Sequence, residues 1–372
     1  MAERLIVFPY NIQFAPILRH KELFKGYEIS NLISLNGWGL NGRDAGCADE
    51  GEYIGITVQV NFEEALERCD TVMFIESQAA LDFQKVIYPR IIKAIEANKN
   101  IICTVKLCEE DCKAIKSMCS NKGVYFKCFE YNKSENLREL KEEESIIKVN
   151  TPVIYVLGIS ENTHKFELQL SLREKLMSAG YKVSQIGSRH YCELLGFHSF
   201  PGFIMHSGVS ESNKVVKFNR LVKNIEKYEM PDLIIIGIPG GIMPFNDQFP
   251  NRFGILAYEV AHSVMPDVTI LSTFYQDYKI DYFDMLSKLI RYKFGFEADC
   301  FNVANNYLDW ERSKEENLLS YAVIASSFVD NKNKCYNKLE RPVYNILNSD
   351  DRDKMACFCI SKLAEYGKYG II

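Results

Sequence analysis

One stretch constrains the fold more than any other, residues 153–189, which read VIYVLGISENTHKFELQLSLREKLMSAGYKVSQIGSR. It opens with the apolar run Val153 to Leu157, which is short and rich in β-branched and aromatic residues, as buried strands are. A polar loop follows Gly158, and apolar residues then recur every three or four positions until Gly180, which predicts an amphipathic helix. Lys182 to Ile186 reads as the next strand. This order predicts a βαβ unit of a parallel sheet.

The first loop of this unit is close to a P-loop but departs from it. A Walker A motif reads G-x-x-x-x-G-K-[ST], in which glycines let the backbone wrap the phosphates and the hydroxyl holds Mg²⁺. Here Gly158 and Lys165 stand seven positions apart instead of six, His164 replaces the second glycine, and Phe166 replaces the hydroxyl residue. We expect His164 to resist the positive φ that glycine permits. The loop therefore predicts either an altered anion site or an ordinary turn with a solvated lysine.

A second magnesium position is altered as well. The apolar run at 233–236 predicts a central strand, and in P-loop proteins of the dethiobiotin-synthetase kind such a strand ends in an acid that holds Mg²⁺ through water. Gly237 stands at that position. Both changes argue against a competent ATPase or kinase.

Polar residues near the predicted strand ends are the candidates for binding an anion. In open α/β sheets ligands bind outside the carboxyl ends of the strands, where loops and helix N-termini offer backbone N–H groups. A strand-end asparagine reads the purine base in related P-loop folds, and Asn305 or Asn306 stands at that position. The candidates in this half of the chain are Asn162, Thr163, Lys165, Arg189, His190, Gly240, Gly241 and Asn305.

The N-terminal part alternates strand and helix patterns, which predicts another parallel sheet with crossover helices. We therefore expect an α/β protein with two Rossmann-like, doubly wound domains, at 1–148 and 149–310, the second resembling a degenerate P-loop NTPase. Residues 311–372 are expected as an α/β extension packed on the second domain. The charged run 132–144 predicts a linker helix. Expected elements include a helix over Ile12 to Leu23 and a strand over Tyr321 to Phe328.

A glycine-rich loop at 36–46 carries the candidates of the first domain. It contains four glycines together with Trp38, Arg43 and Asp44. Such a loop at strand ends suits ligand recognition, and equally a surface loop whose glycines make tight turns. If it is a recognition loop, it is expected to face one cleft together with the candidates of the second domain.

Composition excludes several classes of protein. Hydrophobic residues make up 47% and charged residues 25% of 372 residues, which is ordinary for a globular protein. The net charge of −5 argues against a nucleic-acid surface. The sequence lacks an apolar run of the roughly 20 residues needed to span a bilayer, and it opens without a signal-peptide pattern. We expect a cytoplasmic protein.

Five of the twelve cysteines fall between Cys103 and Cys128, which raises the hypothesis of a metal or Fe–S carrier. The set is Cys103, Cys108, Cys112, Cys119 and Cys128. Neither paired CxxC motifs nor a ferredoxin spacing is present, so we expect structural thiols, no metal and no cofactor. Weak binding of a nucleotide or phosphate at the altered loop stays open.

Several longer motifs resemble a known family. The motifs are GWGLNGRDAG, CDTVMFIES, HKFELQLSLREKLMSAGYKVSQIGSR, GFHSFP, IIGIPGGIMP and FGFEADCF. Together they resemble clostridial peptide maturation system proteins, which are found beside cysteine-rich bacteriocin-type precursors and radical SAM maturases. The resemblance implies an accessory role in making a ribosomally synthesised, modified peptide, with the precursor peptide or the maturase as partner and a homodimer left open. The alternatives are an enzyme that uses a His/Arg/Lys cleft, and the metal carrier above.

Overall fold

The computed structural model describes residues 2–77, 79–129 and 145–369. The chain forms two compact units, residues 1–131 with 193–196, and residues 132–192 with 197–372. Each is an α/β unit built on its own sheet, as the alternation of strand and helix patterns predicts. The linker helix expected over 132–144 lies outside the described residues.

The sheet of the first unit is parallel throughout. Its strand order is β3-β2-β1-β4-β5-β6, which is the doubly wound Rossmann order. The chain reverses direction across the sheet between β1 and β4. The strands are β1 (Glu3–Phe8), β2 (Tyr27–Ile33), β3 (Val58–Gln59), β4 (Thr71–Phe74), β5 (Asn100–Cys103) and β6 (Phe126–Cys128).

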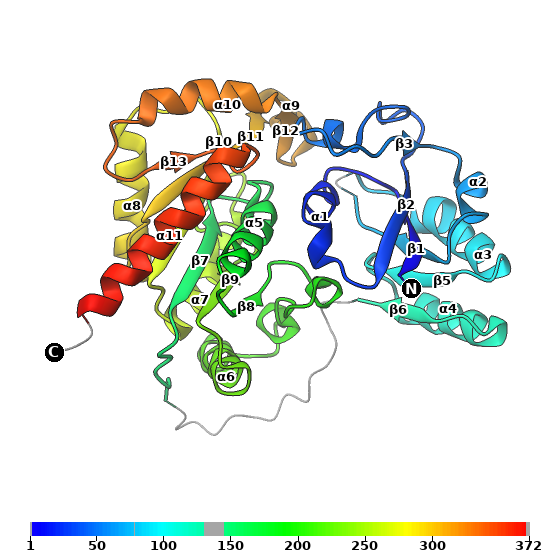
Figure 1. The fold of residues 1–372 in the computed structure, drawn as a ribbon, viewed down its shortest axis with the longest axis horizontal. Helices are drawn as coiled ribbons and strands as arrows, with labels where there is room; N and C mark the ends of the chain where they lie inside the picture. The colour runs from blue at the N-terminus through cyan, green and yellow to red at the C-terminus, as the bar shows by residue number, and fades with distance from the viewer. Residues whose placement is uncertain (1, 78, 130–144, 370–372) are drawn as a thin grey trace. The chain divides into compact units, whose positions relative to one another are not determined.

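Short helices connect these strands. They are α1 (Ala15–Arg19), α2 (Phe62–Leu66), α3 (Tyr88–Glu96) and α4 (Glu109–Lys122), with a π-helical turn, Phe83–Ile87, leading into α3. Apolar residues of α2, α3 and α4 pack in one core with every second residue of β1, β4 and β5, so these helices cover one face of the sheet (Figure 1). The sequence places a cap at Asn61, and its side chain accepts the Glu64 N–H at 3.2 Å.

The sheet of the second unit has the order β12-β11-β10-β7-β9-β8, with β13 beside β11. All of its strands run parallel except β12, which is antiparallel to β11. The predicted P-loop-like strand β7 thus lies directly beside β9, the strand that ends in Gly237. The strands are β7 (Val153–Gly158), β8 (Val183–Ile186), β9 (Leu233–Gly237), β10 (Val268–Tyr275), β11 (Cys300–Asp309), β12 (Ser320–Val323) and β13 (Val343–Tyr344).

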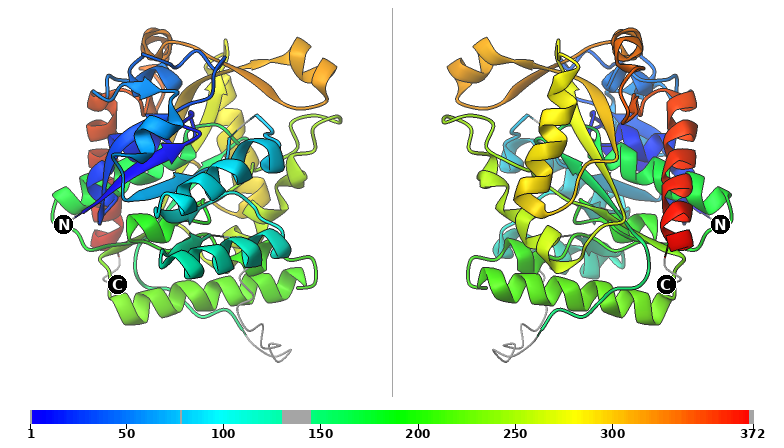
Figure 2. Two further views of the ribbon diagram at one scale, coloured as in Figure 1. Left: turned by 90° about the vertical axis from the view of Figure 1, so that its right-hand side faces the viewer. Right: turned by 90° about the vertical axis from the view of Figure 1, so that its left-hand side faces the viewer.

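Helices cover both faces of this sheet. Residues of α6, α7 and α8 share one core with Tyr155 and Leu157, whereas residues of α5 and α11 share another with Ile154 and Val156. The yellow α8 and the red α11 accordingly lie on opposite faces (Figures 1 and 2). The helices are α5 (Lys165–Ser178), α6 (Glu211–Glu229), α7 (Ile255–Ser263), α8 (Asp281–Phe294), α9 (Trp310–Glu316), α10 (Ser326–Asn333) and α11 (Ser349–Tyr369).

Two expected elements are wrong in their extent. The helix expected over Ile12 to Leu23 is shortened to α1 and a 3₁₀ turn, Lys21–Leu23, with a proline in the first turn of α1. The strand expected over Tyr321 to Phe328 ends at Val323, and Ser326 begins α10. The apolar run there fits an edge strand and a short helix equally well, because short apolar runs do not separate the two.

Candidate functional site

The loop between β7 and α5 folds tightly back on the end of its strand. A Cβ at Gly158 would lie 2.5 Å from the Thr163 hydroxyl and 2.8 Å from Cδ of Lys165. Only glycine fits there, since real Cβ contacts under 3.0 Å essentially never occur. The candidates Thr163 and Lys165 are thus packed on Gly158, and both are buried.

Two residues of this loop have left-handed backbones, Asn162 and His164, each with φ 56°. The expectation that His164 would resist positive φ is wrong. Its ring is held by Asn305, whose Oδ1 lies 2.6 Å from Nε2, and the Asn306 amide donates to the Asn162 carbonyl at 2.5 Å. Contacts with the end of β11 accompany this conformation, although it costs a non-glycine residue free energy. The amide of Asn305 also donates to the Ile324 carbonyl at 2.7 Å, so both of its polar atoms bond within the protein.

Lys165 is the first residue of α5, and its side chain is only 5% exposed. Its amine donates to the Gly240 carbonyl and lies 3.9 Å from a carboxylate oxygen of Glu161. Burial lowers the pKa of Lys165, with Glu161 opposing that shift and Arg189 adding to it. The solvated lysine of the alternative interpretation is therefore not what the structure has.

Glu161 was not among the sequence candidates, yet it occupies the centre of this site. Its Oε1 accepts the N–H of Gly240 at 2.6 Å. Partial desolvation by the surrounding protein would raise the pKa of Glu161, but the charges of Lys165, Arg189 and Arg252 and the Gly240 hydrogen bond together lower it below its ordinary value. A carboxylate is thus held ionised among cationic groups beside a backbone N–H.

Arg252 comes to this site from a strained segment. Asn251, Arg252, Phe253 and Gly254 all have φ between 46° and 66°, a left-handed run of four that L-residues avoid. The Asn251 amide anchors the run by donating to the carbonyls of Ile159 and Met243, each at 2.9 Å. It passes so close to Gly241 that a Cβ there would lie 1.8 Å from the amide nitrogen. The fold therefore maintains a strained turn next to the loop that holds Glu161.

The two magnesium positions of a P-loop protein are filled by other groups. Phe166 is buried, with its ring 6.3 Å from that of Tyr191 and the Arg189 guanidinium 5.4 Å from its centroid. A Cβ at Gly237 would lie 2.0 Å from the side-chain amide of Gln169. That amide donates to the Lys165 carbonyl and the Ser188 hydroxyl, at 2.8 and 2.9 Å, and accepts the Ser188 N–H. An acid at position 237 would collide with it.

The structure brings together most candidates of the second unit and leaves others apart. Lys165, Gly240 and Arg189 converge on Glu161, and Gly241 follows at the anchored turn. His190 is buried, with its ring 5.2 Å from that of Tyr191. Glu161, Gln169 and Arg252 were missed. Glu161 lies in a loop already singled out, whereas a single sequence carries no local signal for Arg252.

The glycine-rich loop of the first unit is organised around Asp44. Its carboxylate accepts backbone N–H groups from Gly46, Ile54, Gly55 and Ile56 at 2.8–3.1 Å. Burial would raise the pKa of Asp44, but these hydrogen bonds outweigh it and lower the pKa. Arg43 is exposed, 3.9 Å from Glu50, and Trp38 is half-buried. Asp44 thus closes its own loop.

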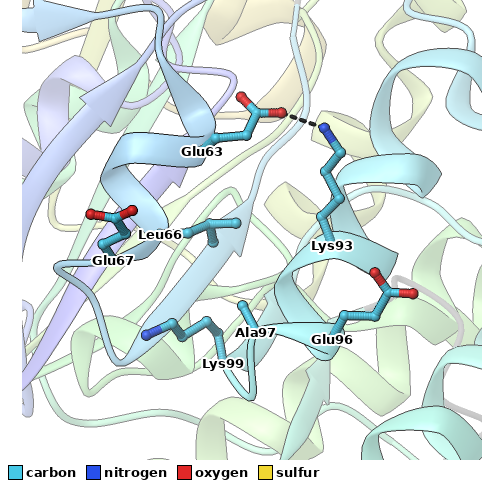
Figure 3. A pocket seen from close by; sticks show the side chains of 7 residues that line it. All are labelled: Glu63, Leu66, Glu67, Lys93, Glu96, Ala97 and Lys99. Carbon is cyan, nitrogen blue, oxygen red and sulfur yellow. Dashed lines mark hydrogen bonds and ion pairs between the residues drawn. The ribbon is translucent and has the colours of Figure 1, made fainter.

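A shallow hollow of about 490 Å³ also lies on the first unit, next to α2 and α3 (Figure 3). Its lining comprises Glu63, Leu66, Glu67, Lys93, Glu96, Ala97 and Lys99. Lys93 bonds to Glu63, and Lys99 donates to the Cys69 carbonyl at 2.8 Å. Both lysines therefore already have partners in the chain.

The five cysteines between 103 and 128 form no disulfide in the structure and differ in exposure. Cys103 and Cys119 are buried, Cys112 and Cys128 are half-buried, and Cys108 is exposed. Within the described ranges, His, Cys, Asp and Glu side chains do not gather in any group of three or more that could hold a metal ion. In the same ranges, every helix is too short or too polar to cross a membrane.

Comparison with known proteins gives a likeness of fold. No protein-family model and no curated protein matches this sequence. A crystal structure of a DUF1611 family protein from Anabaena variabilis ATCC 29413 is similar, with a TM-score of 0.55 and 11% sequence identity. The match covers 84% of this chain and 91% of that one. At this identity the likeness concerns the fold alone.

Proposed function

We propose that this chain is a cytoplasmic accessory protein of peptide maturation, which binds an anionic group of its partner at the loop between β7 and α5. The binding site is inferred from the buried Lys165, which lies at the carboxyl edge of the sheet together with Glu161 and the Gly240 backbone. A buried lysine is costly and shifts its pKa, which is typical of functional positions. The pathway rests on the sequence motifs, which cover both units.

The site favours binding over nucleotide hydrolysis. P-loop enzymes neutralise phosphate charge with Mg²⁺ held by a hydroxyl and an acid. Phe166 provides no ligand, and the Gln169 amide fills the space beside Gly237. The alternative of an enzyme with a His/Arg/Lys cleft is less favoured, because His164 is engaged with Asn305 and His190 is buried.

Thermal unfolding tests this proposal. Succinate or phosphate should raise the Tm of the wild type above that in sodium chloride of equal ionic strength, because a ligand of the folded state stabilises it. Lys165→Met should abolish the increase. Mg·ATP should raise the Tm no more than ATP without magnesium. An increase that requires magnesium, or one that persists in Lys165→Met, would contradict the proposal.

A further inference from the structure

The carboxylate of Glu161 indicates what kind of anion this site takes. Its Oε1 accepts the Gly240 N–H at 2.6 Å, and its Oε2 lies 3.9 Å from the Lys165 amine. The Glu161 side chain is nevertheless 60% exposed, in contrast to the 5% exposure of Lys165. Glu161 therefore contacts the Gly240 N–H while most of its side chain stays accessible to solvent. A planar, singly charged, two-oxygen group therefore fits this position.

We propose that the ligand group of this site is a peptide carboxylate, which displaces the Glu161 carboxylate from Gly240 and takes over its contacts. This inference rests on the proposed function. Glu161 then acts as an internal competitor, which keeps the cationic groups neutralised in the free protein. Glu161 also sets the specificity of the site, because only a ligand group that takes over the contacts of Glu161 can bind without a net loss of favourable interactions.

Charge favours a carboxylate over a phosphate. A phosphate carries up to two negative charges, and P-loop sites balance them with a magnesium ion as well as a lysine. Here Phe166 and Gln169 fill the magnesium positions. The Lys165 amine also donates a hydrogen bond to the Gly240 carbonyl. Its charge still attracts an anion, but not all of its N–H groups are available to one. Arg189 and Arg252 add positive charge near this position. The contacts that Glu161 itself makes, one backbone N–H and the Lys165 amine at 3.9 Å, suit a single carboxylate.

Small probes distinguish the two sources of a peptide carboxylate. Acetyl-Gly-Glu-Gly-amide carries only a side-chain carboxylate, acetyl-Gly-Gly-Gly only a C-terminal one, and acetyl-Gly-Gln-Gly-amide neither. Each probe, and inorganic phosphate, is titrated into the full-length ¹⁵N-labelled protein at constant ionic strength while the Gly240 amide resonance is followed. We expect at least one carboxylate probe to shift this resonance at lower concentration than phosphate does, and the amide probe to leave it unchanged.

A charge-neutral variant tests the displacement. Glu161→Gln should tighten binding of the effective carboxylate probe by about tenfold, because the internal competitor loses its negative charge while the cations stay. Glu311→Gln, which removes an exposed charge on α9, should leave the affinity unchanged. Unchanged or weaker binding by a folded Glu161→Gln protein would overturn the inference.

The wild-type titrations decide the case even if Glu161→Gln fails to fold. Phosphate binding more tightly than both carboxylate probes would overturn this inference and leave the proposed anion site standing. If neither the carboxylate probes nor phosphate shifts the Gly240 resonance, the proposed site fails and this inference fails with it. The source of the carboxylate is read from which of the two probes is effective.

Discussion

The side-chain amide of Gln169 occupies the space that a side chain at Gly237 would need, since a Cβ there would lie 2.0 Å from it. Gln169 lies on α5 and Gly237 ends β9, so this contact joins the helix after the altered loop to the neighbouring strand. The amide makes three hydrogen bonds around it. Position 237, where P-loop proteins carry a magnesium ligand, is thus closed off by a side chain of the adjoining helix.

Gly237→Ala should destabilise the protein by about 1–3 kcal/mol, because overpacking a filled core displaces its neighbours. The double variant with Gln169→Ala should lose less stability than the sum of the two single changes. The shorter side chain at position 169 leaves room for the new Cβ at position 237, and that Cβ fills part of the space left by the amide. Urea unfolding of the wild type, both single variants and the double variant measures this coupling. Additive costs would mean that Gln169 moves aside freely.

Lys165→Met should leave the free energy of unfolding at pH 7 unchanged or raise it by up to about 2 kcal/mol, because the variant avoids desolvating the amine while the exposed Glu161 carboxylate keeps its water. Burial lowers the pKa of Lys165, so the folded state carries the full cost of the charge below its folded pKa. That cost disappears as the pH rises above the ordinary lysine value. Any stability gained in the variant should therefore shrink between pH 7 and pH 10.5, as urea unfolding at both pH values would show. A loss of more than about 1 kcal/mol at pH 7 would mean that the Gly240 contact outweighs desolvation.

Asp44→Asn should destabilise the first unit by about 1–3 kcal/mol at pH 7. One carboxylate oxygen accepts the N–H groups of Gly55 and Ile56, and an amide NH₂ in its place would face two donors. Because the pKa of Asp44 is lowered in the folded state, its contribution is present above the unfolded pKa and is lost as pH falls through the folded one. The difference from wild type should therefore diminish below about pH 4. Arg43→Ala, as the exposed control, should change stability by less than about 0.5 kcal/mol. A difference that stays constant down to pH 2 would contradict this account.

The sequence predicts most of the fold because its signals are local. Asn61 precedes its helix with an acceptor side chain, and the run at 233–236 has the apolar continuity of a central strand. It also locates the loop from Gly158 to Lys165. The arrangement inside that loop depends on distant partners, since Asn305 and Asn306 of β11 hold His164 and Asn162. Arg252 is placed by a strained run anchored through Asn251, which no local periodicity encodes.

Asp44 illustrates a limit of composition-based reasoning about sites. An acidic residue beside Trp38 and Arg43 in a glycine-rich loop has the chemistry of a recognition site. The four backbone donors that it accepts are brought together only when residues 54–56 fold back on the loop. The folding back of residues 54–56 therefore decides that the Asp44 carboxylate faces its own backbone and not a ligand.

The proposed binding site for the partner peptide consists of Lys165 and the Gly240 backbone. A direct experiment is calorimetric titration of a cysteine-rich, bacteriocin-type precursor peptide, the proposed partner, into the wild type, Lys165→Met and Lys182→Met, the last being an exposed-lysine control. We expect binding by the wild type and by Lys182→Met with equal affinity, and binding at least about tenfold weaker by Lys165→Met, because a charged contact is lost. Equal affinity of all three proteins, or no binding by the wild type, would contradict the proposed site.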